Sequence, residues 1–142
     1  MKHTDLKIRI LTRSASFIGQ VILDFDHNTN DAARYLIVGM SHNEIALSRL
    51  FKPGAMNELL FEKCCRISLK DQDADDGAPI TLFADTTKLI SKDLGSVMPL
   101  LNKRKGKHSS RISKSDIHLV LSRMKACNTI PESIKDKFLL SF

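Results

Sequence analysis

Apolar and polar residues alternate near the start of the chain, along residues 6–13, in the period-two pattern of a half-buried β-strand. The small residues Ser14 to Ser16 suit a turn, and a second apolar run extends from Phe17 to Phe25. We therefore predict a β-hairpin over residues 6–25. Its outward face carries three basic side chains, those of Lys7, Arg9 and Arg13.

The apolar residues between 33 and 40 fit two structures equally well. Their spacing is helical, yet the run Tyr35–Val38 serves equally as a buried strand, so the pattern leaves the choice open. Residues 41–44 then read Ser-His-Asn-Glu, which has the form of a helix capping box, and an apolar stripe follows. This pattern predicts a short helix over 45–50 that ends near Pro53.

Two further strands are predicted at residues 66–70 and 80–84, as antiparallel neighbours joined by a long acidic loop. The loop, residues 71–77, has aspartates at the spacing of calcium ligands. It lacks the glycine and the final glutamate of an EF-hand, so that motif is excluded. Short helices are expected on either side of this strand pair, one from Met56 to about Glu62 and one from an Asp85 N-cap to about Lys92.

The C-terminal third has the clearest helical periodicity. Apolar residues at 117, 120, 121 and 124 follow the i, i+3, i+4, i+7 rule, behind Ser113 or Ser115 as the N-cap. Residues 129–132 form a second capping box and begin a final helix. Together the segments predict a single α+β domain, residues 1–142, with a small antiparallel sheet that starts with an N-terminal β-hairpin, inserted helices and a C-terminal helical hairpin.

Length and composition are those of an ordinary globular domain with one core. The chain has 142 residues, of which 42% are hydrophobic and 27% charged. Its cysteines are Cys64, Cys65 and Cys127, an odd number without ligand spacing, so we predict free thiols, no metal site and no cofactor. Neither a signal peptide nor an apolar run of about 18 residues occurs, which favours a cytoplasmic protein without a membrane span.

Positive charge is concentrated in one segment. The chain carries 22 Lys and Arg against 16 Asp and Glu, and residues 103–111 hold five of these cations and no acid. This segment lacks the apolar residues of a core, so we expect a flexible loop. Clustered Lys and Arg neutralise phosphates and release counterions, which points to nucleic acid, DNA or RNA, as the partner. The predicted phosphate-binding set is Lys103, Arg104, Lys105, Lys107, Arg111 and Lys114, reinforced by Lys7, Arg9 and Arg13.

Catalysis is not expected, because the five histidines are scattered and no nucleophile or phosphate-loop motif occurs. The leading hypothesis is therefore a small non-enzymatic protein associated with nucleic acid. A competing hypothesis is a hydrolase that uses Asp24, Asp26 and His27 around a metal. The two C-terminal helices also suit a helix-turn-helix with Lys135 and Lys137 exposed, although plain helical packing explains their pattern better.

The main alternative to nucleic-acid binding is a protein-interaction or homo-oligomeric scaffold module. The acidic loop 71–77 and the basic loop 103–111 are complementary in charge and suit a contact between two chains. The last five residues, 138–142, include four large apolar side chains. These pack either on the sheet of their own chain or against a partner.

Overall fold

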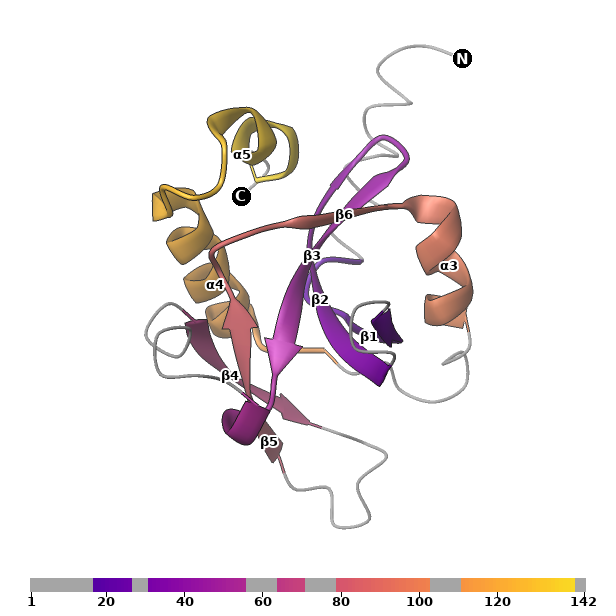
Figure 1. Ribbon diagram of the computed structural model, residues 1–142, viewed down its shortest axis with the longest axis vertical. Coiled ribbons are helices and arrows are strands. Elements are labelled where there is room, and N and C mark those ends of the chain that lie inside the picture. The colour runs from indigo at the N-terminus through magenta and orange to yellow at the C-terminus, as the bar shows by residue number, and fades with distance from the viewer. Residues whose placement is uncertain (1–16, 27–30, 56–63, 71–78, 103–110, 140–142) are drawn as a thin grey trace.

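The computed structural model describes residues 17–26, 31–55, 64–70, 79–102 and 111–139, and the structural statements below concern these residues (Figure 1). They form six strands, a short 3₁₀ turn and three α-helices. In chain order the elements are β1 (Val21–Asp26), β2 (Asp31–Ser41), β3 (Glu44–Phe51), η1 (Pro53–Ala55), β4 (Cys64–Lys70), β5 (Pro79–Asp85), β6 (Ile90–Asp93), α3 (Leu94–Asn102), α4 (Lys114–Ala126) and α5 (Glu132–Phe138).

The strands form an antiparallel sheet in the order β1-β2-β3-β5-β4, and β6 also pairs with β3. The predicted α+β class, with an antiparallel sheet that starts with a hairpin, is confirmed. The hairpin consists of β1 and β2, so the partner of the predicted return strand 17–25 is β2. The predicted first strand 6–13, the predicted helix 56–62 and the acidic loop 71–77 lie outside the described residues.

The segment 33–40, which the sequence left open between helix and strand, belongs to strand β2. The helix predicted over 45–50 is wrong, because these residues form strand β3. Ile45, Ala46 and Leu47 are all fully buried, so both faces of β3 are covered. A strand covered on both faces lacks the polar alternation by which a strand is recognised in a sequence.

The supposed capping box at residues 41–44 is the turn between β2 and β3. Ser41 pairs with Glu44 across this turn, and His42 adopts a positive φ of 51°. A turn of two residues between antiparallel strands requires such a conformation. The sequence of residues 41–44 therefore fits both a helix cap and a hairpin turn, and the pairing of β2 with β3 decides between the two structures.

The strands predicted at 66–70 and 80–84 are confirmed as the antiparallel pair β4 and β5, whereas the helix predicted after Asp85 is wrong. Asp85 Oδ1 accepts from the backbone N–H of Thr87 at 2.9 Å, as an N-cap would. The chain then turns through residues 86–89 and pairs with β3 again as β6. The cap thus stabilises the irregular bulge of residues 86–89, and the helix begins only at Leu94.

The C-terminal helices confirm the predicted boundaries within two or three residues. Ser113 caps α4 by accepting from the N–H of Asp116, and the buried positions of α4 are those that the periodicity predicted. Thr129 does not cap α5; its hydroxyl donates to the carbonyl of Thr87 in the bulge. Phe138 and Leu139 are buried, so the described part of the apolar C-terminus packs within its own chain.

The segment formed by Arg111 and Ile112 joins the two edges of the sheet. Arg111 forms a β-bridge with Gln20, just before β1, and Ile112 forms one with Leu69 of β4. The N–H of Ile112 also donates to the carbonyl of Gly19 at 3.0 Å. Because β1 and β4 are the two ends of the strand order, this segment brings the edges together in the manner of a closed barrel.

The helices cover this sheet from two sides (Figure 1). Helix α4 packs against β4 and α5 against β2, whereas α3 contacts β1, β3 and β6. Buried Leu, Ile, Val and Met side chains fill the space between the helices and the sheet. None of the helices described is long and apolar enough to cross a membrane.

Candidate nucleic-acid interface

Two of the nine predicted phosphate-binding residues, Arg111 and Lys114, lie in the described part of the chain. Both are exposed. The remaining seven lie outside it, namely Lys103, Arg104, Lys105 and Lys107 of the basic loop and Lys7, Arg9 and Arg13 of the N-terminal segment. The charge pairing predicted between the acidic and basic loops also stays a prediction, because residues 71–78 and 103–110 are not described.

The structure brings the ends of the two basic segments together. Residues 103–110 lead directly into Arg111, and the N-terminal segment leads directly into Phe17. Gln20, three residues after Phe17, is bridged to Arg111. The two segments richest in positive charge therefore join the fold at the same place, where the sheet edges meet.

Helix α4 extends this positive region along its exposed side. Lys114 and Lys125 are both exposed and eleven residues apart, which is close to three helical turns, so they lie on one side of the helix roughly 16 Å apart. His118 is exposed on the same side. This stripe can follow a phosphate backbone over several nucleotides.

Two arginines lie where α4 passes the edge strand β4. Arg123 donates from Nη1 to the carbonyl of Cys64 at 3.2 Å, and Arg66 is exposed on β4 itself. The one carboxylate of α4, Asp116, accepts the backbone N–H of Ser68 at 3.2 Å and so serves to cap the strand edge. We name the group Arg66, Arg111, Lys114, Arg123 and Lys125 the α4–β4 basic surface. It covers two sides of α4, because helical spacing places Arg123 opposite Lys114 and Lys125.

Three ion pairs between described residues involve cations outside this surface. They are Lys92 with Asp24 at 2.6 Å, Lys135 with Glu132 at 3.2 Å and Lys137 with Glu44 at 2.9 Å. In the part of the chain described, neither Arg66 nor Lys114 has such a partner. Arg66 and Lys114 are thus exposed cations without an ion pair in that part of the chain, whereas Lys92, Lys135 and Lys137 are each paired with a carboxylate.

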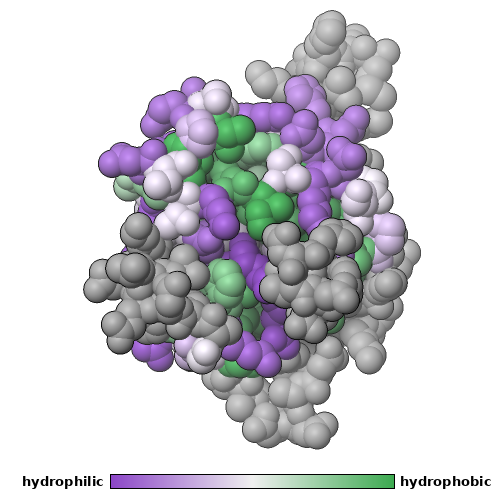
Figure 2. Space-filling model, viewed as in Figure 1, coloured by the Kyte–Doolittle hydropathy of each residue, from purple (hydrophilic) through white to green (hydrophobic). Residues whose placement is uncertain are grey.

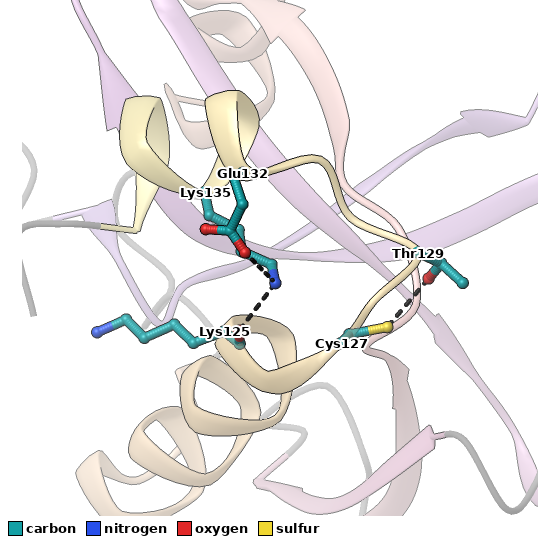
Figure 3. A network of polar contacts seen from close by, with 5 residues as sticks. All are labelled: Lys125, Cys127, Thr129, Glu132 and Lys135. Atoms are coloured by element: carbon teal, nitrogen blue, oxygen red, sulfur yellow. Dashed lines mark hydrogen bonds and ion pairs between the residues drawn. The ribbon is translucent and has the colours of Figure 1, made fainter.

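The end of α4 is fixed to α5 by a lysine that the sequence analysis expected to be exposed (Figure 3). Lys135 is only 8% exposed, and its Nζ donates to the carbonyl of Lys125 at 2.8 Å and to Glu132. A helix-turn-helix that reads bases with Lys135 is therefore excluded. The same bond holds the last turn of α4 and with it the position of Lys125.

Aromatic side chains do not form an open platform for bases in the described residues. Arg49 lies between the rings of Tyr35 and Phe51, with its guanidinium carbon 5.4 and 5.2 Å from their centroids. No aromatic side chain among those described is fully exposed: Tyr35, Phe83 and Phe138 are buried, and Phe17 and Phe51 are half-buried. Stacking on bases requires an accessible ring face. The exposed groups of this surface that could contact nucleic acid are therefore Lys and Arg side chains, which bind phosphates.

Sequence reasoning missed three members of this surface, Arg66, Arg123 and Lys125. The eleven-residue spacing of Lys114 and Lys125 on a predicted helix was a usable signal for one of them. No pattern in the sequence indicated that α4 would lie along β4. That packing alone places Arg123 of α4 against β4, the strand that carries Arg66.

The cysteines are free thiols, as predicted, with different surroundings. Burial, and then the nearby Asp85 carboxylate, raise the pKa of Cys64 to about 11, so this thiol is neutral and unreactive at ordinary pH. Cys127 is partly exposed, with its Sγ 3.0 Å from the Thr129 hydroxyl (Figure 3). Because that hydroxyl donates to Thr87, its oxygen accepts from the Cys127 thiol.

The hydrolase hypothesis relies on Asp24, Asp26 and His27, and of these only the Asp24 side chain is described. Asp24 is bonded to Lys92 at 2.6 Å, and no group of three or more metal-ligating side chains occurs among the described residues. The side chains of Asp26 and His27 lie outside this part of the chain.

No family model, no curated protein and no solved structure matches this chain.

Proposed function

We propose that this protein binds nucleic acid, without sequence preference and without catalysing a reaction. Lys114, Lys125 and Arg66 of the α4–β4 basic surface contact phosphates, together with Lys103, Arg104, Lys105 and Lys107 of the basic loop. The exposure of several cations along α4 and β4 is the observation that carries this proposal.

Electrostatics explains why such a surface binds a polyanion. Each cation that neutralises a phosphate releases a condensed counterion, so the affinity falls steeply as salt is added. The convergence of both basic segments at Arg111 supports the proposal, because a compact group of cations raises the local potential more than scattered ones do. The absence of an open aromatic platform among the described residues favours backbone contacts over base recognition.

The test is the salt dependence of binding by the full chain. Fluorescence anisotropy with labelled double-stranded DNA, single-stranded DNA and RNA is measured over a range of potassium chloride concentrations. We expect binding at low salt, and a slope of log affinity against log salt that falls by about one when Lys114→Gln removes one phosphate contact. Replacing Lys103, Arg104, Lys105 and Lys107 together with Gln reduces the slope by about four.

Lys137→Gln is the matched control, because it removes the same charge from a helix but from a lysine already paired with Glu44. We expect its salt slope to equal that of the unmodified chain. Failure to bind any of the three nucleic acids at low salt would falsify the proposal. Equal losses for Lys114→Gln and Lys137→Gln would remove the assignment to the α4–β4 basic surface.

A further inference from the structure

Helix α4 carries its cations on two flanks, and the crest between the flanks is uncharged. The crest is the side opposite the buried stripe, and its four residues are all exposed: Ser115, Leu119, Ser122 and Ala126. Their spacings of four, three and four residues place them on one side of the helix. Figure 1 shows α4 at the periphery of the described fold, so this crest faces outward.

The first flank of α4 is a row of basic side chains. Lys114, His118 and Lys125 are exposed and follow one another at spacings that return to the same side of the helix. The two lysines are roughly 16 Å apart along the axis, which corresponds to about five nucleotides of one DNA strand. The row is therefore long enough to follow one phosphate backbone.

The second flank faces β4 and is basic as well. Arg123 comes nine residues after Lys114, about two and a half turns, and so lies on the opposite side of the helix. Its bond to the Cys64 carbonyl at 3.2 Å uses one of the five N–H donors of a guanidinium. Arg66 is exposed on β4 itself, whereas the carboxylate of Asp116 is bonded to the β4 backbone. Both flanks thus offer donors to phosphates.

The apolar surface in this view lies away from the crest. Figure 2 shows apolar residues gathered between α5 and β6, around a hollow of about 130 Å³ that no crest residue lines. The crest has one large apolar side chain, Leu119, which is 43% exposed, beside two serine hydroxyls and an alanine methyl group. Small uncharged groups of this kind suit the floor of a DNA groove, where hydroxyls bond to base edges and apolar groups contact thymine methyls.

A helix with an uncharged crest between two basic flanks matches the major groove of B-form DNA. With its side chains an α-helix is about 10–12 Å across, and this groove is about 12 Å wide with a phosphate backbone on each side. The minor groove, about 6 Å wide, is too narrow for a helix. The major groove of an RNA duplex is too deep and narrow for side chains to reach its bases.

We propose that α4 lies in the major groove of duplex DNA, an inference that rests on the nucleic-acid binding proposed above. The crest faces the base edges. Lys114 and Lys125 contact the phosphates of one strand, and Arg66 and Arg123 contact those of the other. Serine hydroxyls accept from and donate to bases of every kind, so this position in the groove carries little sequence preference.

The first test fills one groove of the DNA at a time. Fluorescence anisotropy measures binding of the full chain to a plain duplex, to a duplex whose hydroxymethylcytosines carry glucose in the major groove, and to a plain duplex saturated with distamycin in the minor groove. We expect the glucosylated duplex to bind about tenfold more weakly or worse, because glucose occupies the space of α4. Distamycin is expected to change the affinity by less than about twofold.

Duplex RNA of the same sequence provides a comparison without chemical modification. Its phosphates carry the same charge, but its major groove does not admit the helix. We expect the RNA duplex to bind about tenfold more weakly than the plain DNA duplex at equal salt.

The second test changes the crest. Ser122→Glu places a longer, anionic side chain between the two phosphate backbones, and the affinity for duplex DNA is expected to fall by about tenfold or more. Ser96→Glu is the matched control, because it introduces the same side chain at an exposed position of α3, on the opposite side of the molecule from α4 in Figure 1. Neither serine lies in the core, so circular dichroism should show an unchanged fold for both variants.

Equal affinity for the plain and the glucosylated duplex overturns the inference. So do duplex RNA that binds as tightly as duplex DNA, and equal losses for Ser122→Glu and Ser96→Glu. In each of these cases the chain still binds nucleic acid, so the proposed function stands. Absence of binding to every nucleic acid at low salt overturns both.

Discussion

Gly39 shows how a single residue position can depend on the whole fold. A Cβ atom at this position would lie 2.6 Å from the backbone oxygen of Phe138 and 3.0 Å from its Cβ. Phe138 ends α5, which packs on β2 at this point. The glycine is therefore needed for the close approach of helix and strand. Nothing in the local sequence around residue 39 indicates that need.

Gly39→Ala is expected to lower the free energy of unfolding by about 1–3 kcal/mol, because the new methyl group meets backbone atoms that cannot rotate away. Urea denaturation followed by circular dichroism measures the change. Gly54→Ala is the matched control, since a Cβ at that position has no atom within 4 Å. Equal stabilities for the two variants would contradict the close packing of α5 on β2.

At the scale of elements, prediction succeeded where one face of an element is polar. Helix α4 alternates exposed and buried sides, and its capping serine and buried stripe were read correctly from the sequence. Strand β3 is buried on both sides, and the sequence pattern of its residues wrongly predicted a helix. A short apolar run fits a helix and a doubly buried strand equally well. The choice depends on pairing with strands that are distant in the sequence, which the run itself does not show.

Ser113→Ala tests the predicted cap of α4. The Ser113 hydroxyl accepts from the Asp116 N–H at 3.2 Å, and its loss is expected to cost about 1 kcal/mol of stability. The measurement is again urea denaturation. Ser122→Ala, at an exposed position inside the same helix, is expected to be neutral or slightly stabilising because alanine has the higher helix propensity. A Ser113→Ala variant as stable as Ser122→Ala would show that the cap contributes nothing.

At the scale of the whole molecule, the closing segment at Arg111 and Ile112 connects stability with the proposed function. It joins the β1 and β4 edges and also marks the point where both basic segments enter the fold. Ile112 is only 4% exposed, so the contact is part of the core. The same two residues thus hold the sheet edges together and present Arg111 at the surface beside α4.

Ile112→Ala is expected to lower the free energy of unfolding by about 2–5 kcal/mol, because it removes buried methyl groups where the two sheet edges meet. Circular dichroism during urea denaturation should show one cooperative transition at lower urea. Leu119→Ala serves as the comparison, since Leu119 is 43% exposed on α4 and should change stability little. Similar losses for both variants would argue against a closed sheet.

The sequence by itself determined the α+β class, the β4–β5 pair, the two C-terminal helices, the free thiols and the concentration of positive charge. These features are local, because capping, periodicity and charge are properties of neighbouring residues. Only the tertiary structure decided that residues 33–51 form two strands, that Asp85 begins a bulge, and that Arg123 of α4 contacts β4, the strand that carries Arg66. Those outcomes depend on contacts between residues far apart in the chain, whose burial and hydrogen bonding override local preference.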